Sequence, residues 1–286
     1  MRILYFIIDL ARLFRLTNCL IAVTGTLVGA YLTGDDWLIP SVYRAAGAVL
    51  LLCAAGNALN DLMDIKTDRI SHPKRVLVSG RISPTLAAVS SVLLVLAGLI
   101  LLFSAGIAPF EWGVAGAVAI LFYDLLLKRV VLLGNLMVAL SAGLTFMVGA
   151  AAANPSNLLN LPGPLLPASL AILYHFVREV VKDVEDLDGD QAVGIKKLPS
   201  RIGIRPSLMV GLGVLIILTV LTSLPFFLGW FGVPYLVLAI GLGELPSIIL
   251  VAGLTIAVRP RLLRFTAAFL KVGMVLGLAA LLFPRR

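Results

Sequence analysis

Uncharged stretches of about 20 residues follow one another along almost the whole chain. In helical conformation, a window of that length is long enough to cross the hydrocarbon core of a bilayer. We predict nine such spans, at roughly 14–34, 42–61, 84–108, 111–128, 130–153, 163–183, 207–230, 234–257 and 263–284. The pattern therefore predicts an all-α, polytopic membrane protein, with residues 1–286 forming a single bundle of nine transmembrane helices.

Two uncharged stretches are too long for a single crossing. The stretch 130–177 is predicted to turn at 154–164, which reads Asn-Pro-Ser-Asn and then Pro-Gly-Pro near its end. The stretch 206–258 is predicted to turn between Gly229 and Pro234.

Composition excludes a water-soluble protein. Apolar residues make up 60% of the chain and charged residues only 13%, with a mean hydropathy of +1.06, whereas soluble domains carry about 25% charged residues. No folded monomer of this size could hide so much apolar surface from water. Cys19 and Cys53 each stand alone in an apolar run, which predicts neither a disulfide framework nor a metal-binding cysteine cluster.

The positive charges indicate an orientation. With nine spans, 19 of the 23 Lys and Arg residues fall on the side of the N-terminus. Because cytoplasmic loops gather Lys and Arg, we predict an integral cell membrane protein with a cytoplasmic N-terminus. The same rule explains the net charge of +8 without a nucleic-acid partner.

Acidic residues gather in two short segments, which hold nine of the fifteen. The segments lie within 60–75 and 178–201, and the same offsets of 0, +3 and +7 occur in both. The residues are Asp61, Asp64 and Asp68 in the first motif, and Asp183, Asp186 and Asp190 in the second. On a helix, this spacing places three carboxylates on one stripe, and Asn60 extends the first.

Such stripes restrict where the acids can lie. A carboxylate at mid-bilayer costs roughly 2.5 to 3.5 kcal/mol on insertion scales, so six cannot lie there. We predict that they sit at helix ends and face a polar cavity on the cytoplasmic side. Oxygen ligands without nearby His or Cys favour Mg²⁺ over zinc or iron.

Each acidic segment is followed by basic residues, including Lys74 and Arg75 after the first and Arg201 after the second. Carboxylates that hold Mg²⁺ beside Arg and Lys form a site for a polyanion such as diphosphate. Solvated charged loops are the simpler alternative, but they would seldom repeat one spacing twice.

These motifs resemble those of a known family. Asn60-Asp61-x-x-Asp64-x-x-x-Asp68 with the following Pro73-x-Arg75, and Lys182-Asp183-x-Glu185-Asp186-x-x-Gly189-Asp190, are similar to the two aspartate-rich motifs of the UbiA superfamily of intramembrane prenyltransferases. Within it, the chain most resembles the digeranylgeranylglyceryl phosphate synthases. That similarity rests on Arg178-Glu179-x-x-Lys182-Asp183, on Tyr123 with Leu127-Lys128-Arg129, on Gly134-Asn135 and on Gly143-Leu144-Thr145-Phe146.

The resemblance implies an activity and a set of roles. It implies a Mg²⁺-dependent enzyme that moves a geranylgeranyl group from its diphosphate to the hydroxyl of geranylgeranylglyceryl phosphate, a lipid-soluble acceptor. We assign catalysis to Asp64, Asp68, Asp186 and Asp190; metal binding to Asn60, Asp61, Asp64, Asp68, Asp183, Asp186 and Asp190; and diphosphate binding to Arg75, Lys128, Arg201, Lys182, Arg15 and Asn18.

Some roles stay open. Asn18 follows Arg15 in an Arg-x-x-Asn arrangement seen in the superfamily, but it could equally cap a helix. Phe122, Tyr123 and Phe146 either line the path of the prenyl chain or serve ordinary helix packing. His175 is interpreted as a core histidine, and Glu244 is left outside the site.

Two rival functions also stay open. An aromatic, quinone-precursor or chlorophyll-type prenyltransferase would share the diphosphate site and differ in its acceptor pocket. A Mg²⁺ or organic-anion transporter would also carry acids on membrane helices, although transporters tend to place broken helices at mid-membrane.

Overall fold

The computed structural model describes residues 2–34, 36–122, 126–127 and 130–284, and within these ranges it contains helices and no β-strand. The long helices are α2 (Leu16–Tyr31), α3 (Pro40–Met63), α5 (Pro84–Ala105), α6 (Ile107–Phe122), α7 (Leu133–Ala153), α8 (Leu165–Glu185), α11 (Ile204–Phe227), α13 (Leu245–Ile256) and α14 (Pro260–Ala280). The shorter ones are α1 (Arg2–Leu13), α4 (Ile65–Ser71), η2 (Pro155–Asn157), α9 (Leu187–Ala192), α10 (Leu198–Ile202), α12 (Val233–Leu236) and the π-helix η3 (Val237–Glu244).

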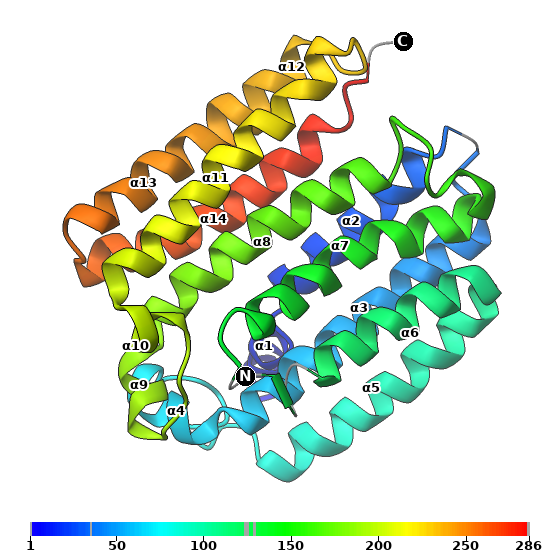
Figure 1. The fold of residues 1–286 in the computed structure, drawn as a ribbon. Helices are drawn as coiled ribbons and strands as arrows, with labels where there is room; N and C mark the ends of the chain where they lie inside the picture. The colour runs from blue at the N-terminus through cyan, green and yellow to red at the C-terminus, as the bar shows by residue number, and fades with distance from the viewer. Residues whose placement is uncertain (1, 35, 123–125, 128–129, 285–286) are drawn as a thin grey trace.

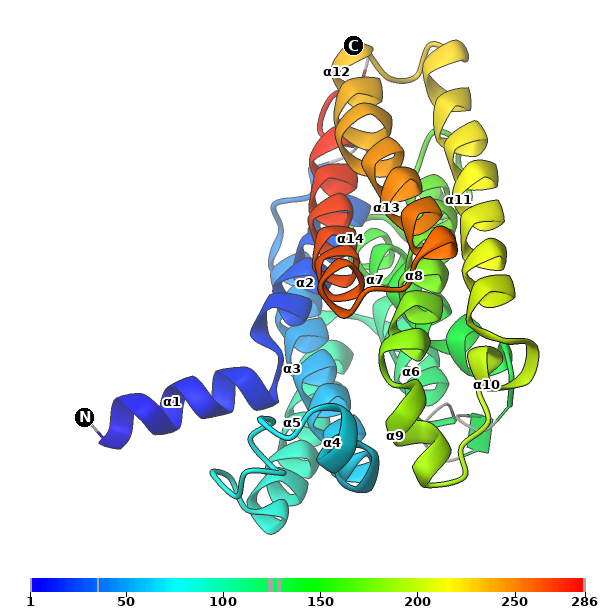
Figure 2. The ribbon, with the colours of Figure 1, turned by 90° about the vertical axis from the view of Figure 1, so that its left-hand side faces the viewer.

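The long helices run side by side as a bundle (Figure 1). Helices α2, α3, α5, α6 and α7 form one part, and α8, α11, α13 and α14 form the other, with α8 packed against α7. The short helices α4, α9 and α10 gather at one end (Figure 1). Helices α4 and α9 belong to the two acidic motifs, so the motifs share this end of the bundle. The C-terminal end of α14 lies at the opposite end (Figure 2).

Six helical segments are long and apolar enough to cross a membrane by length and composition: Pro40–Met63, Pro84–Ala105, Leu133–Ala153, Ile204–Phe227, Val233–Ile256 and Pro260–Ala280. The apolar helices α2 and α6 are shorter. The prediction of an all-α, multi-pass membrane protein is confirmed. Both predicted turns also occur, because α7 ends at Ala153 before α8 begins at Leu165, and α11 ends at Phe227 before α12 begins at Val233.

Proline residues set several helix boundaries. Pro40, Pro84 and Pro260 begin α3, α5 and α14, where the missing proline N–H interrupts no helical hydrogen bond. Ahead of Pro84, the Ser83 side chain accepts a hydrogen bond from the backbone N–H of Leu86 at 3.2 Å.

The first helix was not among the predicted elements. Helix α1 extends sideways from the bundle (Figure 2) and leaves Ile3, Leu4 and Tyr5 largely exposed. Its polar residue Asp9 accepts hydrogen bonds from Arg12 at 3.3 Å and from Arg81 at 2.7 Å. An amphipathic helix of this kind suits the boundary between water and lipid.

Helices α2 and α7 touch through their backbones. A Cβ atom on Gly29 would lie 2.1 Å from the carbonyl oxygen of Phe146, and one on Gly149 would lie 1.8 Å from that of Thr26. Only glycine permits this approach, which fixes α2 and α7 as one wall of the bundle interior.

Candidate active site

The two acidic motifs are built in the same way. In each, the middle aspartate ends a long helix and begins a short one: Asp64 lies between α3 and α4, and Asp186 lies between α8 and α9. Their backbone angles are nearly equal, with φ of −92° and −89°. The prediction of three carboxylates on one straight helix is therefore corrected, because both helices break at the middle acid.

Two arginines hold the first motif. The carboxylate of Asp61 accepts hydrogen bonds from Arg15 and, at 3.3 Å, from Nη1 of Arg75. The same Arg75 nitrogen donates to Oδ2 of Asp68 at 2.5 Å. Both Asp61 and Asp68 are buried, so the arginine charges offset the repulsion between two acids removed from water.

A lysine plays the matching part in the second motif. Nζ of Lys197 lies 3.0 Å from Oδ1 of Asp183 and 3.0 Å from Oδ2 of Asp190. The side chain of Asn135 on α7 donates a hydrogen bond to Oδ2 of Asp183 at 2.7 Å. All four residues are buried, which makes this a closed polar network.

The two motifs meet directly. Nε2 of His72, after α4, lies 2.7 Å from Oδ1 of Asp186. Next to this contact, α9 packs against α4 at Gly189, where a Cβ atom would lie 2.7 Å from the carbonyl oxygen of Thr67 and 2.3 Å from Oγ of Ser71. The absence of a side chain at Gly189 thus allows the short helices of the two motifs to approach each other.

Burial and neighbouring charge act on the acids in opposite directions. Burial raises the pKa of Asp68 and of Asp190 above the ordinary value, because Arg75 and Lys197 offset only part of the desolvation. Burial also acts to raise the pKa of Asp186, but the hydrogen bond with His72 and the charges of Lys182 and Lys197 outweigh it. The net result is a pKa of Asp186 well below its ordinary value.

The donor set suits a hard cation such as Mg²⁺. The motifs present buried carboxylates with amide oxygens nearby, which are the ligands that Mg²⁺ prefers. Within the described residues, no three acidic, histidine or cysteine side chains converge closely enough to hold a metal by themselves. The positive charge among the acids comes instead from Arg15, Arg75 and Lys197.

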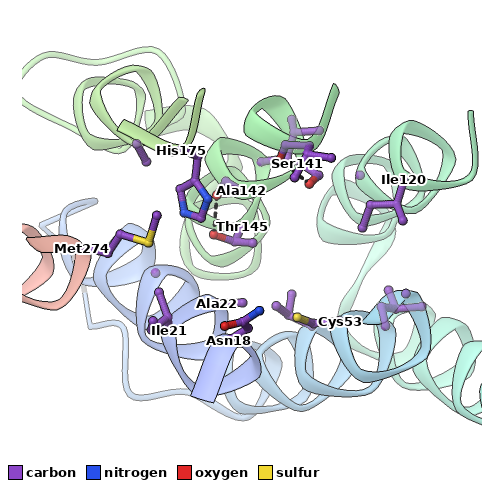
Figure 3. A pocket seen from close by; sticks show the side chains of 18 of the residues that line it. Asn18, Ile21, Ala22, Cys53, Ile120, Ser141, Ala142, Thr145, His175 and Met274 are labelled. Atoms are coloured by element: carbon purple, nitrogen blue, oxygen red, sulfur yellow. Dashed lines mark hydrogen bonds between the residues drawn. The ribbon is translucent and has the colours of Figure 1, made fainter. Parts of the chain in front are cut away.

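A cavity of about 620 Å³ extends from this end into the bundle. Figure 3 looks into it, and the labelled residues that surround it are Asn18, Ile21 and Ala22 of α2, Cys53 of α3, Ile120 of α6, Ser141, Ala142 and Thr145 of α7, His175 of α8 and Met274 of α14. Its polar lining includes Arg15, Asn60, Arg178, Glu179, Lys182 and Lys271, and the greater part is apolar. The cavity can therefore take a long hydrocarbon chain beside a charged group.

A second hollow, of about 540 Å³, adjoins the first motif. Its lining is rich in cations, with Arg12, Arg15, Lys74, Arg75, Arg81 and Arg264. Arg15 lines both hollows, so its side chain lies where the largely apolar cavity and the second, basic hollow meet.

The structure brings most of the predicted residues to this end of the bundle, with exceptions. Asn18, Asn60, Lys182 and Phe146 line the cavity. Arg201 is exposed on α10, Phe122 is half-exposed at the end of α6, and neither lines either hollow. Tyr123 and Lys128 lie outside the described residues. The roles assigned to all of these residues stay predictions.

Sequence reasoning missed several side chains of the site. His72 and Lys197 pair with the acids, Asn135 supports Asp183, and Arg178 and Lys271 line the cavity. His72 stands in the basic segment after the first motif, and this position in the sequence could have indicated that it belongs to the site. His175 and Glu244, set aside from the site, also line the cavity.

Residues 22–273 match the model of the UbiA prenyltransferase family, most of the chain. The chain belongs to the UbiA prenyltransferase family. It is therefore a prenyltransferase, and the family resemblance of its motifs is confirmed.

Similar curated proteins cover most of the chain. A digeranylgeranylglyceryl phosphate synthase of Methanopyrus kandleri is 35% identical over 274 residues, which are 94% of this chain and 96% of that protein. The protein of the same name from Methanococcus aeolicus is 37% identical over 227 residues, 78% of each chain.

Solved structures agree on the fold. A structure described as that of digeranylgeranylglyceryl phosphate synthase in membranes superposes with a TM-score of 0.69 at 29% identity, covering 97% of each chain. A UbiA homolog from Archaeoglobus fulgidus bound to GPP and Mg²⁺ gives a TM-score of 0.66 at 17% identity, covering 96% of this chain and 99% of that one. The second likeness shows the shared fold alone.

Proposed function

We propose that this prenyltransferase transfers a geranylgeranyl group from its diphosphate to the hydroxyl of geranylgeranylglyceryl phosphate, with Mg²⁺. The observation that carries the proposal is the junction of the two acidic motifs through His72 and Asp186 beside a largely apolar cavity. The similarity to synthases named for this product supports the choice of substrates.

The acids provide the place for the leaving group. Asn60, Asp61, Asp64, Asp68, Asp183, Asp186 and Asp190 are the residues that would hold Mg²⁺ in this site. When bound there, Mg²⁺ supplies positive charge that stabilises the departing diphosphate. Arg15, Arg75 and Lys182 lie among the same acids and contribute further cationic charge toward phosphate oxygens.

The apolar cavity serves the other half of the reaction. The carbon–oxygen bond to diphosphate breaks heterolytically, the acceptor hydroxyl oxygen forms the new ether bond, and its proton is released. The allylic cation formed on the way would react with any water nearby. A lining that includes Ile21, Val95 and Leu144 keeps bulk water away and accepts the prenyl chain.

The proposal includes a topology. We infer a single domain of nine spans with a cytoplasmic N-terminus and the site on the cytoplasmic side. Its support is the cluster of exposed cations at the end that carries the acids, among them Lys66, Arg69 and Arg205. Labelling of single cysteines placed at Lys66 and at Ser156 in sealed cells would test it, since the two positions should face opposite sides.

An acceptor assay tests the activity itself. Purified protein in lipid receives labelled geranylgeranyl diphosphate and, separately, geranylgeranylglyceryl phosphate or an aromatic acid. We expect product only with the glyceryl lipid; product only with an aromatic acid or naphthoate would contradict the assignment. Family membership sets aside the transporter alternative.

The metal site is tested by two variants. Asp64→Ala and Asp186→Ala are expected to abolish turnover while the protein stays folded and membrane-inserted, because each acid lies at a helix junction rather than within a span. Retained activity of both variants at saturating Mg²⁺ would remove the metal-binding role of the motifs.

A further inference from the structure

One lysine that lines the cavity has no partner among the described residues of the site. Lys271 lies in α14, lines the cavity and is half-buried. Its ammonium group makes no hydrogen bond or ion pair with any residue that the structure describes. A charged group that is partly removed from water without a partner is unfavourable, because the hydration that it loses is not replaced. Its position therefore suits an anionic ligand.

The surroundings of Lys271 are also cationic. Its charge interacts with those of Arg178, Arg15 and Lys182, and the only acid among these neighbours is Glu179. Arg178 donates to Oε1 of Glu179 at 2.5 Å, and Nζ of Lys182 lies 3.9 Å from Oε2. Glu179 is thus the one carboxylate of this group, which also contains Lys271, Arg178, Arg15 and Lys182.

These four cations have different interaction partners. Arg15 is hydrogen-bonded to Asp61 of the first motif, and Lys182 lies 3.8 Å from Asp186 of the second. Both therefore belong to the end where the diphosphate is expected. Among the acids that the structure describes, Arg178 contacts only Glu179, and Lys271 contacts none. Two cations remain that the diphosphate site does not use.

The helix that carries Lys271 lies apart from the short helices of the motifs. Helix α14 packs mainly against α2, α8, α13 and η3, while α4 and α9 pack against each other. Lys271 consequently lines the cavity from a helix that carries neither acidic motif.

The chemistry of the proposed acceptor requires a second anion site. In geranylgeranylglyceryl phosphate, the reacting hydroxyl and the phosphate are on neighbouring carbons. When the hydroxyl oxygen reaches the first carbon of the prenyl chain, the acceptor phosphate must lie close to the diphosphate. Two such anions repel each other strongly in a cavity of low dielectric, so cations are needed between and beside them.

We propose that Lys271 and Arg178 bind the phosphate of the lipid acceptor. The inference rests on the proposed function and extends it to the basis of acceptor specificity. Lys271 supplies the charge without a protein partner, and Arg178 supplies a planar donor group that can bind two phosphate oxygens. Nζ of Lys182 lies 3.9 Å from Glu179, the partner of Arg178, and 3.8 Å from Asp186 of the second motif.

The experiment measures binding and turnover of two acceptors. One is geranylgeranylglyceryl phosphate, and the other is the same lipid alcohol without phosphate. In the Lys271→Met variant, we expect affinity for the phosphorylated lipid to fall about tenfold to a hundredfold, the range for losing a charged hydrogen bond. Affinity for the dephosphorylated lipid and for geranylgeranyl diphosphate should change by less than about threefold.

Three further variants sharpen the test. Lys271→Arg keeps the charge and should keep most of the affinity for the phosphorylated lipid. Arg178→Gln should lower that affinity as Lys271→Met does. Arg261→Gln is the matched control, because it removes an exposed charge from the same helix that lines neither hollow; it should leave both substrates unaffected.

The outcomes separate this inference from the proposed function. If wild-type protein prenylates the phosphorylated lipid and Lys271→Met leaves its binding unchanged, the inference is wrong and the function stands. Equal weakening of both acceptors, or of the acceptor and geranylgeranyl diphosphate together, would also overturn it. If wild-type protein prenylates only an aromatic acceptor, the proposed function itself fails.

Discussion

His72 and Asp186, separated by 114 positions in the chain, face each other with Nε2 2.7 Å from Oδ1. This contact joins the segment after the first acidic motif to the middle acid of the second. It also holds Asp186 in its ionised form, because the hydrogen bond with His72 and the charges of Lys182 and Lys197 outweigh burial and lower the pKa of Asp186.

A pH dependence of stability follows from that lowered pKa. A carboxyl group whose pKa is lower in the folded state contributes stability that is present above its unfolded pKa of about 4 and is lost as the pH falls below it. We expect His72→Ala to raise the pKa of Asp186 and to reduce the unfolding free energy above about pH 4 by about 1–3 kcal/mol.

Thermal unfolding in detergent between pH 3 and pH 7 measures this effect. His72→Gln is the control, because its amide can donate to Asp186 from nearly the same position as Nε2. A variant His72→Ala whose stability follows the wild-type curve at every pH would show that the contact does not stabilise the ionised acid.

The packing of α9 on α4 at Gly189 makes a steric prediction. A methyl group there would overlap Oγ of Ser71 and the carbonyl oxygen of Thr67. Gly189→Ala should therefore push the motifs apart, cost about 1–3 kcal/mol of stability and lower kcat at least tenfold. Gly213→Ala on α11 is the control, since nothing lies within 4 Å of a Cβ atom there; comparable activity of both variants would argue against a need for close motifs.

Two neighbouring lysines offer a matched pair. Lys197 is buried between Asp183 and Asp190, whereas Lys196 is exposed. Lys197→Met leaves two buried carboxylates without their cation and should cost about 3 kcal/mol or more, measured by unfolding without Mg²⁺. Adding Mg²⁺ should restore part of the loss if these acids bind it. Lys196→Met should change neither quantity, and an equal effect of both substitutions would refute the pairing.

The arginines after the two motifs are expected to differ. Arg75 contacts Asp61 and Asp68, while Arg201 is exposed and lines neither hollow. Arg75→Ala should raise the KM for geranylgeranyl diphosphate at least tenfold, and Arg201→Ala should raise it less than about threefold. Steady-state kinetics at saturating acceptor decides between them; a large effect of Arg201→Ala would restore its predicted role as a diphosphate ligand.

The sequence predicted the membrane fold and the acidic motifs for clear physical reasons. Membrane spans can be predicted from the sequence because only long uncharged helices cross lipid as single segments. The acids from Asp61 to Asp68 could be identified as a motif because their spacing recurs from Asp183 to Asp190. The helix breaks at Asp64 and Asp186 were not predicted, since they depend on how the short helices pack.

Other parts of the site depend on contacts between distant segments. Lys197 counted only as one positive charge of a loop until its position between two acids was known. Lys271 interrupts an apolar span, and a single charge in such a span can equally extend toward the interface. Gly189 is one glycine among 26, and only its contact with Thr67 distinguishes it.

The backbone contact of Gly29 with Phe146, and of Gly149 with Thr26, also limits how the enzyme can exchange its lipids. These two contacts lie within one turn of each helix, so α2 and α7 cannot part without breaking a close-packed crossing. A hydrocarbon chain that moves between the bilayer and the cavity must therefore pass between other helices. Motions that open the bundle should leave α2 and α7 in contact.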